Sequence, residues 1–225
     1  MRIKVLLAKT EGVDKALTKK WMIGLGDEKH LRVSRLRHEK DKAVVVAAHR
    51  LLRFGLKNIF GITPAPDDWG VAEYGKPYLI RPAGIHFNIS HSECMAMCAL
   101  HDSPVGIDIE HIRPVPDGVL QRVMSNAERQ AYFINQEKSR LFYQIWTLKE
   151  AYLKYSGIGL IDGLNELTIC PMGSDIRSNV SGCQFVLIDN IPEYQAALCA
   201  AEHVKHSVEW VEREKLMDDF ECGIS

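Results

Sequence analysis

The stretch Val-Gly-Ile-Asp-Ile-Glu at residues 105–110 places an apolar residue at every second position. Such alternation is typical of a β-strand with one buried face, so Ile107 and Ile109 are expected on one side. Asp108 and Glu110 then share the other side, about 6–7 Å apart, close enough for both carboxylates to bind one cation. The same pattern also suits an edge strand with a solvated acidic face, and the hexapeptide alone leaves both interpretations open.

The composition around this strand excludes several classes of protein. The 225 residues include 28 Lys and Arg against 29 Asp and Glu, so the chain has no net positive charge that would attract nucleic acid or an anionic membrane. No apolar run approaches the roughly 20 residues of a membrane span, and the N-terminal run is too short for a signal peptide. The six cysteines lack a Cys-x-x-Cys pair, which favours reduced thiols. We therefore expect a cytoplasmic protein without nucleic-acid or membrane partners.

Outward from residues 105–110, helical and strand-like segments are mixed, which predicts the α+β class. The segment 39–54 has helical periodicity with Gly55 as its stop, and residues 63–82 are expected to be mostly loop. A hairpin is predicted with Ser90 and His91 at its corner. The other expected helices are 125–135, with Ser125 as N-cap and Glu128 at the capping-box spacing, and 139–155, followed by Gly157 as the closing residue. The expected strands are the N-terminus, 85–89, 94–100, 166–170, 184–188 and 194–200.

The predicted helix 139–155 carries charged residues in an unusual arrangement. Glu150 and Lys154 are four residues apart and share one face, which is compatible with a binding site. An ordinary surface ion pair, with a contribution of about 0.3–0.5 kcal/mol, explains the same spacing. Lys149 lies on the apolar face of this helix. Either its methylene groups extend past the aromatic side chains to bring the ammonium to solvent, or an anion near the helix binds the ammonium.

Ser90 and His91 suit phosphate binding at the end of rigid strands. A nucleophilic Ser-His dyad is the competing interpretation, but no Gly-x-Ser-x-Gly turn surrounds Ser90. Lys29, Arg32 and Lys76 add positive charge that fits either an anion site or a solvated surface.

Together these motifs resemble the Sfp-type, or surfactin-synthetase-activating, 4′-phosphopantetheinyl transferases. The resemblance runs from residue 29 to residue 160, in the same order along the chain. It rests on YGKPYL at 74–79, HFNISHS at 86–92, VGIDIEHIRP at 105–114, WTLKEAYLKYSGIGL at 146–160 and, more weakly, EKHLRVSRLRHEKD at 28–41.

The resemblance implies an enzyme that transfers 4′-phosphopantetheine from coenzyme A to a serine of an acyl, peptidyl or aryl carrier protein. The released product would be 3′,5′-ADP, and the pathway would be polyketide, nonribosomal peptide or fatty acid biosynthesis. The implied fold is a monomer of two similar α/β halves, residues 1–104 and 105–225. A pseudo-twofold axis relates the halves, and the active site lies between them.

The resemblance also implies roles for individual residues. Mg²⁺ would be bound by Asp108, Glu110 and Glu150. The catalytic residues would be Glu150 and Lys154, with Glu150, alone or through a metal-bound water, as the base. Val44 and Val45 depart from the family pattern, in which some members have polar coenzyme A contacts there. The implied coenzyme A contacts are Lys29, Arg32, Lys76, Pro77, Ser90, His91, Asp108 and Lys154.

Two other functions are compatible with these residues. Three carboxylates and a lysine would also serve a magnesium-dependent phosphoester hydrolase, which activates water and needs no protein acceptor. A non-catalytic module that binds coenzyme A without transferring its arm is the second alternative.

Overall fold

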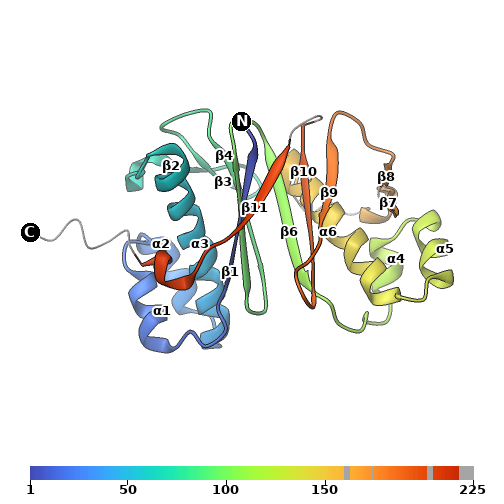
Figure 1. Ribbon diagram of the computed structural model, residues 1–225, viewed down its shortest axis with the longest axis horizontal. Helices are drawn as coiled ribbons and strands as arrows, with labels where there is room; N and C mark the ends of the chain where they lie inside the picture. The colour runs from blue at the N-terminus through green and yellow to red at the C-terminus, as the bar shows by residue number, and fades with distance from the viewer. Residues whose placement is uncertain (160–162, 174, 202–204, 218–225) are drawn as a thin grey trace, which may run out of the picture.

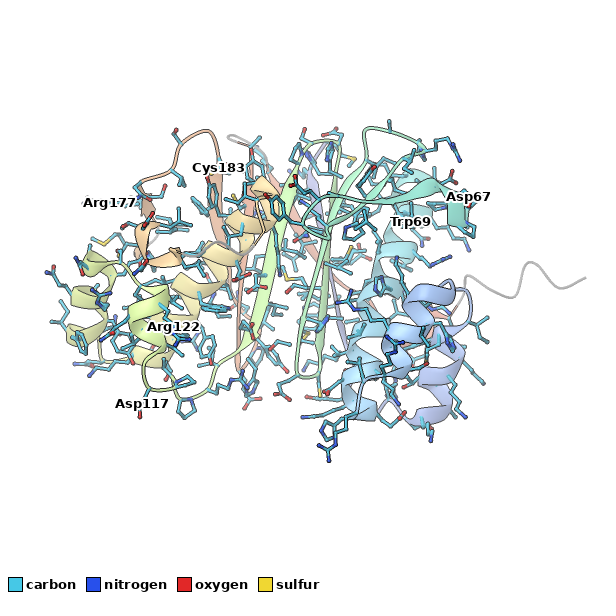
Figure 2. The ribbon with its side chains drawn as sticks, turned by 180° about the vertical axis from the view of Figure 1, so that it is seen from behind. Asp67, Trp69, Asp117, Arg122, Arg177 and Cys183 are labelled. Atoms are coloured by element: carbon cyan, nitrogen blue, oxygen red, sulfur yellow. The ribbon has the colours of Figure 1, made fainter. Side chains whose placement is uncertain are left out.

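A computed structural model describes residues 1–159, 163–173, 175–201 and 205–217, apart from the side chains of residues 27 and 28. The elements form four layers: helices, a sheet, a second sheet, and helices again (Figure 1). Figure 2 shows the same layers from behind, with side chains filling the space between the two sheets. The predicted α+β class is confirmed.

The first sheet has the strand order β11-β1-β5-β4 and is covered on its outer face by the long helix α3. Helices α1 and α2 pack against α3, and a small β2–β3 hairpin follows it. The bounds are β1 Ile3–Lys9, α1 Lys15–Met22, α2 Asp27–Ser34, α3 Glu39–Phe60, η1 Pro66–Asp68, β2 Trp69–Val71, β3 Pro77–Leu79, β4 His86–Ser92, β5 Met95–His101 and β11 His206–Trp210.

The second sheet has the order β6-β10-β9, and the long helix α6 covers its outer face. A small β7–β8 hairpin and the short helices α4 and α5 lie beyond α6. The bounds are β6 Val105–His111, α4 Val119–Val123, α5 Asn126–Ile134, α6 Lys138–Ser156, η2 Leu164–Glu166, β7 Ile169–Met172, β8 Asp175–Ser178, β9 Gln184–Ile188, β10 Tyr194–Ala200 and η3 Arg213–Leu216.

The predicted alternation of strand β6 is confirmed. Ile107 and Ile109 are fully buried in the core between the two sheets, together with Val5 of β1 and Met97 of β5. Asp108 lies on the other face of β6, toward α6. The strand therefore contributes one face to the central core and the other to a polar site.

The last strand, β11, belongs to the first sheet. Strand β11 pairs in parallel with β1, so the first sheet contains a strand from the C-terminal segment. The first strand of the second sheet begins at Val105, and the division into residues 1–104 and 105–225 stays a prediction. Among the described residues, no helix is both long and apolar enough to cross a bilayer.

Several bounds differ from the sequence-based predictions, and the strand expected at 166–170 lies instead at Ile169–Met172. Helix α3 does not stop at Gly55 but continues to Phe60, and Gly61, with φ of 69°, ends it in the left-handed conformation. Gly55 is instead a packing residue, because a Cβ there would lie 2.6 Å from Cδ1 of Leu100 on β5. Residues 63–82 are not only loop, since they contain the β2–β3 hairpin.

The corner of the β4–β5 hairpin also lies elsewhere than predicted. Ser90 and His91 are inside strand β4, paired with Met97 and Ala96 of β5, and the turn contains Glu93 with a positive φ of 48°. The strand continues because its alternate side chains bind the neighbouring strand β6, a contact that the local sequence does not reveal.

We predict that Gly106→Ala destabilises the protein more than Gly55→Ala does. A Cβ at Gly106 would lie 2.0 Å from the carbonyl oxygen of Ala151 and 2.3 Å from the nitrogen of Tyr155, both backbone atoms of α6. At Gly55 the nearest atoms are ends of leucine side chains, and alanine also favours the helix. Denaturant unfolding should show a loss of at least about 2–3 kcal/mol for Gly106→Ala. Equal losses would contradict this packing argument.

Candidate active site

The two sheets meet at strands β4 and β6, where side chains take the place of a backbone ladder. Oδ1 of Asn88 accepts a hydrogen bond from the backbone N–H of Ile107 at 2.8 Å. Oγ of Ser90 accepts from Ile109 at 3.4 Å, and Oγ of Ser92 accepts from the next alternate residue of β6 at 3.1 Å. Alternate side chains of β4 thus satisfy alternate N–H groups of β6.

The same serines orient the carboxylates of β6. The hydroxyl of Ser90 donates to Oδ1 of Asp108 at 2.8 Å, and that of Ser92 donates to Oε2 of Glu110 at 2.8 Å. A hydroxyl can accept from an N–H and donate to a carboxylate at once. The contact between β4 and β6 through Asn88, Ser90 and Ser92, called the seam below, therefore also fixes the acidic residues.

Helix α6 brings two more charged residues to this position. Nζ of Lys154 lies 2.6 Å from Oδ1 of Asp108 and donates to Oγ of Ser90 at 3.1 Å. The close packing of α6 on β6 at Gly106 makes this reach possible. Glu150, one turn earlier on α6, is close enough for Asp108 and Glu110 to affect its ionisation.

The carboxylates of Glu110 and Glu150 have too little positive charge around them to balance burial and the nearby Asp108. Burial, and then the Asp108 charge, raise the pKa of Glu150 to about 7, although Lys154 opposes the rise. The pKa of Glu110 is also raised, by burial and by Asp108. Within the described residues, Oε1 of Glu150 and Oδ2 of Asp108 are buried without a hydrogen-bond partner. Such atoms are strong candidates for a cationic ligand.

The carboxylates of the candidate site are spaced too widely to share one metal ion in this arrangement. Among the described residues, no three His, Cys, Asp or Glu side chains are grouped closely enough to hold one. The Lys154 ammonium is the cation that Asp108 contacts here, and Ser92 holds one oxygen of Glu110.

A positively charged region lies next to the acidic residues, around His49 of α3. Burial, and then the charges of neighbours that include Lys29, His91 and Arg32, lower the pKa of His49 to about 3. The ammonium of Lys29 makes a cation–π contact with Trp69, 4.9 Å from the centre of its ring (Trp69 is labelled in Figure 2). His49 could not be found from sequence patterns, because only the fold brings α2, α3 and β4 together.

Lys76 points its ammonium at the protein backbone. Its Nζ donates to the carbonyl oxygens of Lys154 and, at 3.4 Å, of Val105. Burial, and then Lys154, lower the pKa of Lys76. Pro77 follows it as the first residue of β3.

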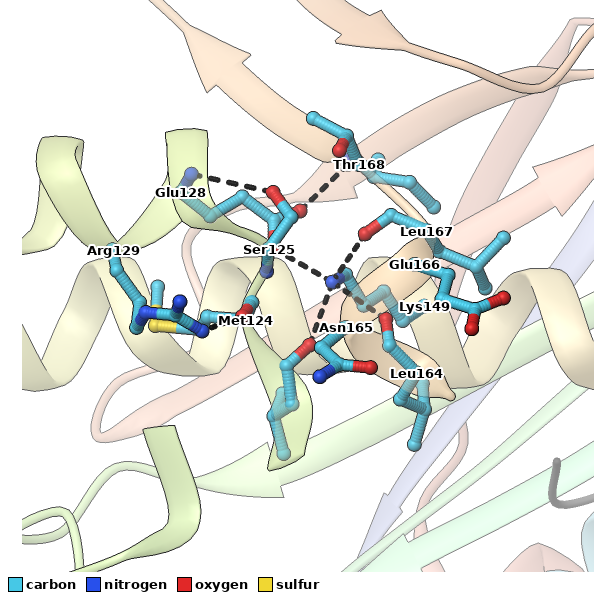
Figure 3. A network of polar contacts seen from close by, with 12 residues as sticks. Met124, Ser125, Glu128, Arg129, Lys149, Leu164, Asn165, Glu166, Leu167 and Thr168 are labelled. Atoms are coloured by element: carbon cyan, nitrogen blue, oxygen red, sulfur yellow. Dashed lines mark hydrogen bonds and ion pairs between the residues drawn. The ribbon is translucent and has the colours of Figure 1, made fainter. Parts of the chain in front are cut away.

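The partner of Lys149 is an anion. Its fully buried ammonium lies 2.6 Å from Oε2 of Glu128 on α5, and it donates to the carbonyl oxygens of Val123, Leu164 and Leu167 (Figure 3). Glu128 also accepts from the backbone N–H groups of Ser125 and Ile169. The Ser-x-x-Glu spacing at 125–128 predicted the cap but not the ion pair, which depends on the packing of α5 against α6.

The structure thus brings together Ser90, Asp108 and Lys154 by direct contact, with Glu110 and Glu150 near enough to interact electrostatically. The side chain of His91 is exposed, and partial desolvation, together with the charges of the nearby Lys154 and Arg32, lowers its pKa. Asp108 is buried, and Glu110, Glu150 and Lys154 are half-buried, so these charged residues do not fit the interpretation as fully solvated surface groups.

The chain is similar in sequence to known proteins over most of its length. The family model of the 4′-phosphopantetheinyl transferase superfamily matches residues 104–199. A 4′-phosphopantetheinyl transferase of Bacillus subtilis is 31% identical over 188 residues, which span 80% of this chain and 84% of that protein. The chain belongs to the 4′-phosphopantetheinyl transferase superfamily. The family resemblance and the enzyme class inferred from the motifs are confirmed.

Two further relatives of this transferase match most of its length at lower sequence identity. The 4′-phosphopantetheinyl transferase Sfp of Bacillus subtilis strain 168 is 27% identical over 81% of this chain and 84% of its own length. The 4′-phosphopantetheinyl transferase HetI of Nostoc sp. is 27% identical over 75% of this chain and 74% of its own. The solved holo-[acyl-carrier-protein] synthase of Thermotoga maritima aligns with 46% of this chain and 64% of its own, at 19% identity and a TM-score of 0.38.

We predict that Lys149→Met lowers the free energy of unfolding of this transferase by about 3–5 kcal/mol, because it leaves Glu128 charged and buried. Lys138→Met, at the exposed start of the same helix, is the control and should change it by less than about 0.5 kcal/mol. Urea unfolding measures both. A loss below about 1 kcal/mol for Lys149→Met would show that the ion pair does not hold α5 on α6.

A second prediction concerns Glu150 in buffer with EDTA. The folded protein retains the Glu150 proton up to about pH 7, whereas the ordinary pKa is 4.5. Its contribution to stability is therefore fully present below pH 4.5 and is lost as the pH rises through about 7. Glu150→Gln, which cannot ionise, should melt about 2–4 °C or more above the unmodified protein at pH 8. The difference should vanish near pH 5, and a difference independent of pH would refute the raised pKa.

Proposed function

We propose that this protein transfers 4′-phosphopantetheine from coenzyme A to a serine of an acyl, peptidyl or aryl carrier protein. The observation that carries the proposal is the buried group of Asp108, Glu150 and Lys154, in which two carboxylate oxygens lack partners among the described residues. The counter-ion of a diphosphate would supply the missing positive charge, and the family membership indicates coenzyme A as the source of the diphosphate.

The residues fit Mg²⁺ as the counter-ion, held by Asp108, Glu110 and Glu150. They are oxygen ligands, which Mg²⁺ prefers, and the raised pKa values of Glu110 and Glu150 report a need for positive charge. When bound, Mg²⁺ supplies electrostatic stabilisation of the diphosphate as its charge grows in the transition state.

Glu150 and Lys154 would act directly in the reaction, and Ser90 would help to hold Lys154. The carrier serine attacks the β-phosphorus of coenzyme A, its Oγ–P bond forms, and the bridging P–O bond breaks to release 3′,5′-ADP. Glu150 accepts the serine proton, for which a pKa of about 7 is well matched near neutral pH. The Lys154 ammonium, fixed by Asp108 and Ser90, stabilises charge on the diphosphate oxygens.

The basic region would bind the rest of coenzyme A. Lys29 and Arg32 would face its 3′-phosphate, with His91 beside them. The shared influence of these three residues on His49 supports one positive region, and positive charge attracts phosphates. Lys76 with Pro77, and Ser90 with Asp108, complete the proposed contacts.

We also propose that the protein acts as a cytoplasmic monomer without nucleic-acid or membrane partners. The near balance of 28 basic and 29 acidic residues supports the absence of such partners. Both β4 and α6, which form the candidate site, come from one chain, which supports a monomer.

The test is incubation with Mg²⁺, coenzyme A and either a purified apo acyl carrier protein or an apo peptidyl carrier protein. Intact-mass measurement should show addition of one phosphopantetheine group to the carrier and release of 3′,5′-ADP. Cleavage of coenzyme A without carrier would indicate the hydrolase instead. Binding of coenzyme A with no cleavage under any condition would indicate the non-catalytic module.

We predict that Asp108→Ala reduces transfer at least about 100-fold while the protein stays folded, because the change removes a ligand of the cation and the partner of Lys154. The control is Asp117→Ala, in the loop before α4 (labelled in Figure 2). Rates of carrier modification and thermal melts measure both. Near-normal transfer by Asp108→Ala would exclude these carboxylates from the reaction.

A further inference from the structure

The β2–β3 hairpin reaches from the first half of the chain to the end of helix α6. Lys76, the last residue before β3, donates from Nζ to the carbonyl oxygen of Lys154, 78 positions later in the chain. Tyr74, in the turn of the same hairpin, lies against Gly159 just after α6, where an added Cβ would be 3.0 Å from the Tyr74 ring. Two neighbouring residues of the hairpin thus contact the end of α6.

The acceptor of Lys76 is a carbonyl that needs a partner. The last four carbonyls of a helix have no N–H four residues ahead within the helix, and Lys154 is three residues before the Gly157 cap. The C-terminal end of a helix also carries partial negative charge, which favours an ammonium there. Lys76 therefore binds α6 at the position where a cation stabilises it best.

This contact involves the residue that holds Asp108. The backbone oxygen of Lys154 accepts from Lys76, while its side chain donates to Oδ1 of Asp108 and Oγ of Ser90. A shift of the last turn of α6 would move the Lys154 ammonium away from both. The Lys76 ammonium itself is directed at two backbone carbonyls, of Lys154 and Val105, and so is not directed at a diphosphate.

We propose that Lys76 is a positioning residue, which fixes the last turn of α6 so that Lys154 meets the reacting diphosphate. The inference rests on the proposed function, and it assigns the Lys76 ammonium to the backbone of α6. Any contact of Lys76 with coenzyme A then comes from its backbone or its stem.

The experiment compares Lys76→Met with Lys76→Arg in the carrier-modification assay, with direct titration of coenzyme A binding by calorimetry. Lys76→Met should lower kcat about tenfold and leave the Kd of coenzyme A within about twofold. Lys76→Arg, which keeps donors at this position, should recover most of kcat. Lys19→Met, an exposed lysine of α1, is the matched control and should behave like the unmodified protein.

A double substitution tests whether Lys76 acts through Lys154. Lys76→Met added to Lys154→Met should slow transfer no further than Lys154→Met alone, because the group that Lys76 positions is then absent. Independent, multiplicative losses would overturn the inference. So would a tenfold weaker Kd of coenzyme A with unchanged kcat, or a lower Tm with unchanged kcat.

The two proposals fail in distinguishable ways. If the unmodified protein modifies neither carrier, the proposed function fails, whatever Lys76 does. If it modifies a carrier and Lys76→Met does so at the same kcat, only the positioning role fails. Should Lys76→Met not fold, Lys76→Gln retains an N–H donor and an uncharged stem, and the same kcat and Kd measurements decide.

Discussion

The seam between β4 and β6 is the constraint on which the rest of the structure depends. No backbone ladder joins the two sheets there; instead Asn88, Ser90 and Ser92 accept hydrogen bonds from N–H groups of β6. Buried N–H groups must be satisfied, so the seam holds only with polar residues at alternate positions of β4. The serine hydroxyls in turn bind Asp108 and Glu110. The contact that assembles the two halves is therefore also the contact that builds the site.

Two of the lysines of helix α6 have opposite surroundings. Lys149 has four oxygen partners, one of which is the carboxylate of Glu128, so it is fully satisfied and serves the fold. Lys154 is the positive group among carboxylates that still have buried oxygens without partners in the described part of the chain. A satisfied network is rigid, whereas an incomplete one is ready for a ligand. The two networks lie about one helical turn apart, so the rigid one supports the reactive one.

Much of the architecture could be predicted from local patterns. Strands β9 and β10 were predicted with their observed bounds, and the Ser125 cap and the Gly157 stop are where the sequence placed them. The errors at Gly55 and at the β4–β5 corner have one cause. From the local sequence, a glycine or a pair of polar residues predicts a turn. In the structure, Gly55 stays helical where it packs closely on Leu100, and Ser90 stays in β4 because it bonds to β6.

By itself the sequence determined the two faces of β6, the shared face of Glu150 and Lys154, and the family, because these depend on spacing along one element or on motif order. Only the tertiary structure decided that the two acidic elements meet, that His49 joins the basic residues, and that Lys76 and Lys149 bind backbone carbonyls and Glu128. These contacts join residues far apart in the chain. Periodicity shows which way a side chain faces on its own element, whereas a long-range contact depends on how the elements pack.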